Sequence, residues 1–418
     1  MMNGLLFWLI LLAVFIGAYF LGARRTAARM AGSSAAPGGA TPGLSPEEVA
    51  ALQAKVEPML AVTGHQFLGN VLEFTGHLRG RADEVFRRLR ETFSGQAVTP
   101  MLLEGERHDV RLVMLPGEKP AGVEARPNWA LHGLLFLATV ATTTWAGALH
   151  AGVNLLREPG RFAVGLPYSL ALLVILGAHE LGHYFTARAH RIRVTPPFFI
   201  PVPFALGTFG AFIRIKSLSP DRRALFDVAV AGPLAGLIFA IPALLAGLRW
   251  SQVVPGNAPA GLAYSGVSLG SSVLLAFLAK VSLGASVAEG SHLLLHPLAF
   301  AGWLGLIVTA LNLLPIGQLD GGHMSHALFG SRHARTISIV ALVCLFLLAL
   351  FVWPGLMFWA FVVFFIAGTR DAPAENDLSP VGGPRLAVGW LTFLVLLLII
   401  VPVPHSLYEA VTLHGPYL

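Results

Sequence analysis

Long apolar runs separated by short polar segments occupy most of this chain. A first run lies at residues 5–21, and seven more follow from residue 129 onward, each close to the roughly 20 residues that a membrane-spanning helix needs. The seven later runs are at residues 129–149, 162–187, 225–248, 297–314, 336–352, 355–368 and 387–402. The pattern predicts an all-α polytopic membrane protein with about eight transmembrane helices.

A region near the N-terminus has a different pattern, typical of a small soluble domain. Ser45, Pro46 and Glu48 form a capping-box signature, which predicts a helix from there to about Val56. Apolar residues at helical spacing predict a second helix at 83–93. Strands are predicted at residues 71–78, 98–103 and 109–115. The region is therefore expected to be a small soluble α+β domain.

These segments divide the chain into five parts. They are an N-terminal transmembrane anchor (1–23), a flexible linker rich in small residues (24–44), the small α+β domain on the cytoplasmic side (45–117), an intramembrane domain (128–370), and a C-terminal transmembrane helix with its tail (371–418).

Arginines and lysines predict the orientation of the spans. The first run has no basic residue before it and is followed by Arg24 and Arg25, which indicates an uncleaved span with its N-terminus outside. The apolar segment 267–283 is uncertain. If it does not cross the membrane, Arg332 and Arg335 lie on the cytoplasmic side, as the positive-inside rule expects. We therefore predict eight spans, with segment 267–283 not crossing.

The composition supports a membrane protein and excludes several other classes. Of the 418 residues, 55% are hydrophobic and 12% are charged, against about 25% charged in soluble domains. The single cysteine, Cys344, excludes an intrachain disulfide framework and a cysteine-based metal site. The net charge of +6 is explained by basic cytoplasmic flanks, so no nucleic-acid partner is expected.

Residue usage also indicates a source. Arginines far outnumber lysines, and alanine and glycine are abundant, which is typical of a GC-rich bacterial genome. We therefore expect a multi-pass protein of a bacterial cytoplasmic membrane. A plastid membrane is the alternative, although no transit-peptide pattern precedes the first run.

The run at 162–187 contains the polar sequence HELGH. His179 and His183 are four residues apart, so on a helix they lie on one face and can bind one metal ion, with Glu180 beside them. Ionisable side chains are costly at membrane depth, which indicates a functional site. The alternative is a buried polar cluster that helps helices to pack.

A catalytic zinc site usually has three protein ligands and an open position for water. Asp320 lies at the cytoplasmic end of an apolar run, and the predicted topology places it on the same side as His183. Pro315 ends the preceding helix, and two glycines after Asp320 let the backbone turn toward the metal. The alternative is a surface aspartate in an ordinary helix-ending turn.

Three histidines follow Asp320 in the sequence. His323, His326 and His333 have no partner at a secure ligand spacing, so we expect loop histidines or residues that support a ligand. His323 is the best candidate for such support.

These motifs together resemble the site-2 protease family of intramembrane zinc metalloproteases. The resemblance rests on HELGH at 179–183, GTFGAFI at 207–213, AGPLAG at 231–236 and NLLPIGQLDGGH at 312–323, and it covers roughly residues 165–330. The sequence is most similar to the ethylene-dependent gravitropism-type branch and its bacterial relatives, because of its PFFIPVP segment and its upstream soluble domain.

The resemblance implies a set of roles. Zn²⁺ would be bound by His179, His183 and Asp320, with Glu180 as general base. Asn312 would polarise the scissile carbonyl or bind substrate. The substrates would be transmembrane proteins in the lipid bilayer, and the active site would face the cytoplasmic side. Many bacterial members carry a PDZ-like domain between the two motifs, and this sequence has no such insertion.

The segment from Pro196 to Lys216 is too interrupted by proline and glycine for a spanning helix. It predicts a membrane-associated hairpin or re-entrant loop. Such a hairpin could offer a strand edge to an unwound substrate. The alternative is a loop that serves only in packing.

Other functions would use the same polar residues. Membrane proteases of the prenyl-protein or heat-shock type take a glutamate as third ligand, whereas this chain offers Asp320. A membrane metal transporter is disfavoured because neither motif occurs twice. A non-proteolytic scaffold is disfavoured because Glu180 is present. The sequence leaves the substrate and the oligomeric state open.

Overall fold

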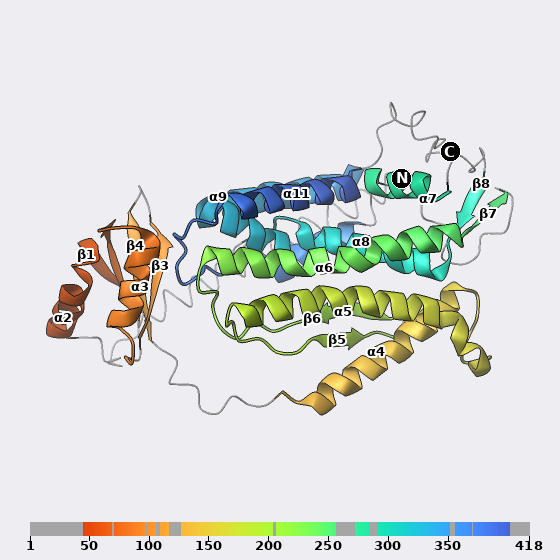
Figure 1. Ribbon diagram of the computed structural model, residues 1–418, viewed down its shortest axis with the longest axis horizontal. Coiled ribbons are helices and arrows are strands. Elements are labelled where there is room, and N and C mark those ends of the chain that lie inside the picture. Colours follow the sequence, from red (N-terminus) through yellow and green to blue (C-terminus); the bar gives the residue numbers. More distant parts are fainter. Residues whose placement is uncertain are drawn as a thin grey trace. The chain divides into compact units, whose positions relative to one another are not determined.

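The computed structural model describes ten stretches of the chain (Figure 1). They are residues 45–68, 71–96, 98–105, 109–116, 127–203, 206–255, 272–283, 291–351, 356–369 and 371–401. The chain forms two compact units: one contains residues up to 122 together with 342–365, and the other contains 123–341 and 366–418. The predicted anchor at 1–23 and linker at 24–44 lie outside the described residues.

The N-terminal domain is a four-stranded antiparallel sheet with two helices. Its elements in chain order are α2 (Pro46–Val56), β1 (Leu60–Leu68), β2 (Val71–Leu78), α3 (Ala82–Thr92), β3 (Val98–Glu104) and β4 (Val110–Pro116), with the sheet order β1-β2-β4-β3. Both predicted helices and all three predicted strands are confirmed. The capping box is also confirmed, since the backbone N–H of Glu48 donates to Ser45 Oγ at 3.2 Å and that of Ser45 donates to Glu48 Oε2 at 2.7 Å.

The sequence did not predict strand β1. Gly64, His65 and Gln66 interrupt its apolar alternation, and most of its residues are exposed because it is an edge strand. Its pairing with β2 is therefore set by backbone hydrogen bonds and not by a buried face.

Five helices in the described chain are long and apolar enough to cross a membrane. They are α4 (Trp129–His150), α5 (Leu166–Ala189) with the 3₁₀ turn η2 (Pro159–Gly165) before it, α6 (Arg222–Arg249), α9 (Asp320–Phe351) and α11 (Gly383–Ile400). Large apolar side chains on them are exposed, among them Phe185, Ile238 and Trp390. Such surfaces suit contact with lipid, so the protein is an integral membrane protein.

Shorter helices complete the membrane part. Helix α8 (Pro297–Leu313) has 17 residues, and α10 (Leu356–Val362) continues as the π-helical turn η4 (Val363–Ala367). Helix α7 (Val273–Leu283) has 11 residues, or about 16 Å at the usual rise, against a hydrocarbon core of about 30 Å. This length agrees with a segment that does not cross. The number of eight spans stays a prediction.

Helix α9 begins well before the apolar run that was predicted at 336–352. Its backbone breaks at Gly330, where φ is +84°, so a first helical section from Asp320 precedes the apolar one. The sequence predicted a turn after Asp320, whereas this residue is the first of a helix.

Two hairpins add short strands to a membrane part that is otherwise helical. Strands β5 (Phe198–Pro201) and β6 (Thr208–Phe212) pair antiparallel, which confirms the predicted hairpin between α5 and α6. Strands β7 (Gln252–Pro255) and β8 (Ser291–Leu294) also pair, and the sequence did not predict them. Their partners are separated by a long stretch of chain, so no local turn signal could identify them.

Helices α5, α6 and α8 pack against one another and form the centre of the membrane part (Figure 1). Small residues make this possible. A side chain at Gly182 of α5 would collide with the backbone of Ala231 on α6, and one at Gly302 of α8 would collide with that of Leu244 on α6. Small residues, such as those of the AGPLAG segment on α6, permit this close approach of helices in a membrane.

Candidate metal centre

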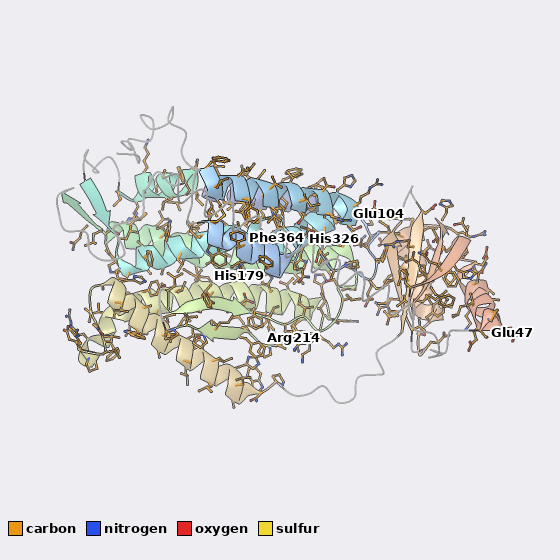
Figure 2. The ribbon with its side chains drawn as sticks, turned by 180° about the vertical axis from the view of Figure 1, so that it is seen from behind. Glu47, Glu104, His179, Arg214, His326 and Phe364 are labelled. Carbon is orange, nitrogen blue, oxygen red and sulfur yellow. The ribbon has the colours of Figure 1, made fainter. Side chains whose placement is uncertain are left out.

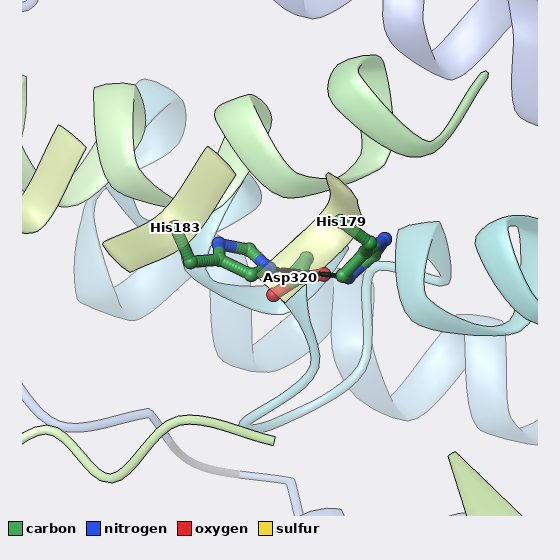
Figure 3. Close-up of side chains that lie close together, drawn as sticks. All are labelled: His179, His183 and Asp320. Atoms are coloured by element: carbon green, nitrogen blue, oxygen red, sulfur yellow. Dashed lines mark hydrogen bonds and ion pairs between the residues drawn. The ribbon is translucent and has the colours of Figure 1, made fainter. Parts of the chain in front are cut away.

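Three predicted ligands meet in the membrane part (Figure 3). The Nε2 atoms of His179 and His183 are 3.1 Å apart, and Asp320 Oδ2 lies 3.3 Å from each. Ligand atoms at 2.0–2.1 Å from a tetrahedral zinc ion would be about 3.3 Å from one another. The donor set and its spacing therefore fit a four-coordinate zinc ion with one open position. Among the described residues, this is the one group of three or more such side chains suited to a metal ion.

Helix α5 places the two histidines by its period alone. His179 and His183 are one turn apart, and their side chains are about 5% and 9% exposed. The Nδ1 of His183 lies 2.8 Å from the carbonyl oxygen of Val228 on α6, to which it donates its proton. This hydrogen bond selects the tautomer whose Nε2 lone pair is free for a metal.

Gly232 of α6 makes room for that ring. A Cβ atom at this position would overlap the imidazole of His183, and one at Gly236 would lie 3.4 Å from His179 Nδ1. The AGPLAG segment therefore lines the metal centre in addition to packing against α5. The sequence alone does not predict this contact, because the partner of a glycine cannot be identified from its own helix.

The loop before α9 brings Asp320 to the histidines. Gly317 has a φ of +49°, and its N–H donates to Ser338 Oγ at 2.6 Å. A Cβ atom at Gly321 would overlap the carbonyl group of Leu313. A Cβ atom at Gly322 would overlap the carbonyl group of Gly317. The two glycines after Asp320 therefore allow the helix start to lie directly against its own preceding loop.

Glu180 is buried beside the ligands and is not one of the three. The backbone N–H of Ile213, one residue beyond β6, faces its carboxylate. The β5–β6 hairpin thus contacts the residue that was predicted as general base.

Asn312 reaches the same place from helix α8. Its Nδ2 lies 3.3 Å from His179 Nε2. An amide N–H₂ group at this position is a hydrogen-bond donor beside the metal centre, where an oxygen atom of a ligand could accept from it. All five residues predicted for the site therefore lie at one location.

The fold and the site define a class of protein: an integral membrane protein with a His-Glu-x-x-His helix and an aspartate that completes a metal centre. Residues 167–352 match the model of peptidase family M50. The chain belongs to this family, the site-2 proteases, and to its gravitropism-type branch.

Three relatives show the extent of the similarity. The chain is 30% identical to the probable zinc metalloprotease EGY1, chloroplastic, of Arabidopsis thaliana over 82% of this chain and 68% of that protein. It is 28% identical to the Arabidopsis EGY2 protein over 87% of this chain and 66% of the relative. It is 30% identical to EGY1 of Oryza sativa subsp. japonica over 82% of this chain and 64% of that relative. The chain thus spans about two thirds of the length of these relatives. No solved structure matches it.

Proposed function

We propose that this protein is an intramembrane zinc metalloprotease that hydrolyses peptide bonds within or next to transmembrane segments of other membrane proteins. The observation that carries the proposal is the triangle of His179, His183 and Asp320, with sides of 3.1–3.3 Å, beside the buried Glu180. The relatives EGY1 and EGY2 are named as probable zinc metalloproteases, which supports both the metal and the reaction.

In this proposal, residues 128–370 are the protease domain, with a catalytic core at 165–330. Residues 45–117 are a separate cytoplasmic domain, and 371–418 hold the last transmembrane helix and tail. The basic flanks support an active site toward the cytoplasmic side, and the residue usage supports a bacterial inner membrane. The chloroplast relatives make a plastid membrane the alternative.

Zinc, when bound, supplies Lewis acidity that makes a water molecule acidic enough to lose a proton near neutral pH. Glu180 takes this proton as general base and passes it to the amine that leaves. Its position one residue after His179 gives the carboxylate reach to the water. The N–H of Ile213 faces the carboxylate from the hairpin side.

Asn312 stabilises the transition state. Its side-chain N–H₂ donates to the oxygen of the scissile carbonyl as negative charge develops there. The distance of 3.3 Å between Asn312 Nδ2 and His179 Nε2 brings this donor next to the metal centre.

The β5–β6 hairpin binds the substrate as an added strand. Each strand of a two-stranded sheet has one unpaired edge, and such an edge can pair with an extended peptide. Strand β6 leads directly to Ile213, whose N–H contacts Glu180. Phe209 and Phe212 on β6 are exposed and offer apolar contacts to a membrane-derived peptide.

A proline in β6 tests this binding mode. Phe212→Pro removes one strand N–H and is expected to reduce cleavage by about tenfold or more, because a strand with proline cannot complete its hydrogen bonds. Zinc content is expected to stay at the wild-type level. The matched control is Phe212→Leu, which keeps the N–H. Equal cleavage by the two variants would show that the hairpin serves only in packing.

The alternative function is metal transport through the same polar residues, or a scaffold without chemistry. The full chain, purified in detergent, is expected to cut a labelled model transmembrane peptide. The same protein in liposomes that contain a zinc-sensitive dye is expected to give no flux above that of empty liposomes. Flux without cleavage would exclude the protease. The absence of both flux and cleavage would favour the scaffold.

A further inference from the structure

A second cluster of ionisable side chains, three of them buried and one half-buried, lies near the start of α9. It consists of His323 and His326 on that helix and of Asp371 and Asp377 on segment 371–381, which we call the strap. His326 Nδ1 lies 3.0 Å from Asp371 Oδ2, and its Nε2 lies 2.8 Å from Asp377 Oδ1 (His326 is labelled in Figure 2). His323 Nδ1 is 2.7 Å from the other oxygen of Asp371. The side chains of His326 and both aspartates are 5% exposed or less.

The contacts of His326 define its charge. Both of its ring nitrogens face carboxylate oxygens, and only the imidazolium form donates from both. Burial alone would raise the pKa of Asp371, but its contacts with His323 and His326 outweigh this effect and lower that pKa to about 2. The cluster is therefore a set of buried charges, and the loss of one member would leave another without its counter-ion.

The cluster is not arranged as a second metal site. The ligands of a metal ion converge on one point, whereas the two nitrogens of His326 face different aspartates. Within the described part of the chain, the metal-binding geometry is found at His179, His183 and Asp320.

The cluster holds the helical turns that begin with Asp320. Residues 320, 323 and 326 are three apart, so their side chains follow one side of α9. Asp371 contacts the second and third of these residues and so attaches that side of the helix to the strap. Because Asp320 is the first residue of α9, a rotation of this turn would move its carboxylate away from the metal.

The strap is also tied to α6, which orients another ligand. Arg222, the first residue of α6, donates its backbone N–H to Ser379 Oγ at 3.0 Å. Its Nε–H donates to the carbonyl of Ala327 on α9 at 2.7 Å. Further along α6, the carbonyl of Val228 accepts from His183. The strap therefore links the helix that carries Asp320 to the helix that orients His183.

We propose that His326, Asp371 and Asp377, together with His323, form a positioning cluster that sets Asp320 against His179 and His183. The inference rests on the proposed function of the metal centre. The cluster acts through Asp320 and touches neither the metal nor the substrate.

The test uses the full chain in detergent and the variant Asp371→Asn. It is expected to weaken Zn²⁺ affinity by 10- to 100-fold, the usual effect of losing a group that supports a ligand. The affinity is measured by competition with a chromophoric chelator. In the cleavage assay, kcat is expected to fall and KM to stay unchanged. The matched control is His333→Gln. His333 is an exposed histidine of α9 whose Nδ1 contacts the carbonyl of Phe329, and its variant is expected to keep wild-type Zn²⁺ affinity.

The absorption spectrum of bound Co²⁺ is a second measurement, and a general loss of stability would not shift its bands. With Co²⁺ in place of zinc, the absorption bands report ligand geometry, and those of Asp371→Asn are expected to be shifted from those of the wild type. Asp377→Asn, which alters one contact, is the second variant if the first does not fold.

Folded variants with weaker metal binding and shifted bands support the proposal. Folded variants with wild-type affinity and bands overturn it, and so does metal loss that occurs only together with unfolding. The wild-type chain reports on the protease itself: zinc-loaded wild type that cuts no transmembrane peptide would refute the proposed function and leave these affinity results unchanged.

Discussion

Glu180→Gln is expected to reduce cleavage by about 10²–10⁴-fold while zinc stays bound. Glutamine has nearly the same shape and can still lie against the N–H of Ile213, but it cannot take a proton from water. Because Glu180 is not among the three metal ligands, zinc affinity is expected to be that of the wild type. Initial rates with a labelled transmembrane peptide and metal analysis of the same sample provide the measurement.

Glu158→Gln is the matched control for this prediction. Glu158 is exposed and pairs with Arg161 outside the metal centre, so its variant is expected to cleave at the wild-type rate. Unchanged cleavage by Glu180→Gln would refute the proposed mechanism. Loss of zinc from that variant would instead show that the carboxylate holds the metal.

Asp320→Asn is expected to abolish both zinc binding and cleavage. The neutral amide oxygen is a weaker ligand, and the change removes the one negative charge that the three ligands contribute to the centre. We expect the zinc affinity to fall more than about 100-fold, beyond the effect of losing a supporting group. Zinc content after dialysis against a weak chelator, together with the cleavage rate, measures both effects.

Asp109→Asn in the N-terminal domain is the control, since Asp109 pairs with His77 there and is no predicted ligand. Both variants are compared with wild-type protein from which a strong chelator has removed the zinc. This stripped wild type is expected to regain cleavage when zinc is added. An Asp320→Asn protein with stoichiometric, tightly bound zinc would exclude the aspartate as third ligand.

Much of the metal centre could be predicted because its strongest signals are local. The spacing of His179 and His183 follows from the helical period, and the structure brings the two rings together as expected. Asp320 was harder to predict as a ligand, since it lies far from His179 and His183 in the sequence. It was found because the charge pattern placed few carboxylates at the same membrane depth.

Other features could not be predicted because they depend on distant partners. The segments β7 and β8 are strands only because they form backbone hydrogen bonds with each other. The strap has almost no regular secondary structure, and its role follows from contacts with α6 and α9 across a large sequence separation. The first section of α9 was missed because its glycines indicated a turn, whereas packing against the preceding loop allows a helix there.

Gly232 has a consequence for the evolution and engineering of this protein. Replacing a glycine within a helix by alanine usually stabilises the helix by about 1 kcal/mol. Here the added methyl group would overlap the ring of His183. Forcing a methyl group into a packed site costs about 1–3 kcal/mol, which cancels the gain in helix propensity, so alanine is not expected to stabilise the protein at this position. Stability and the metal centre therefore both require glycine at 232, and engineering for thermostability has to use other helical positions.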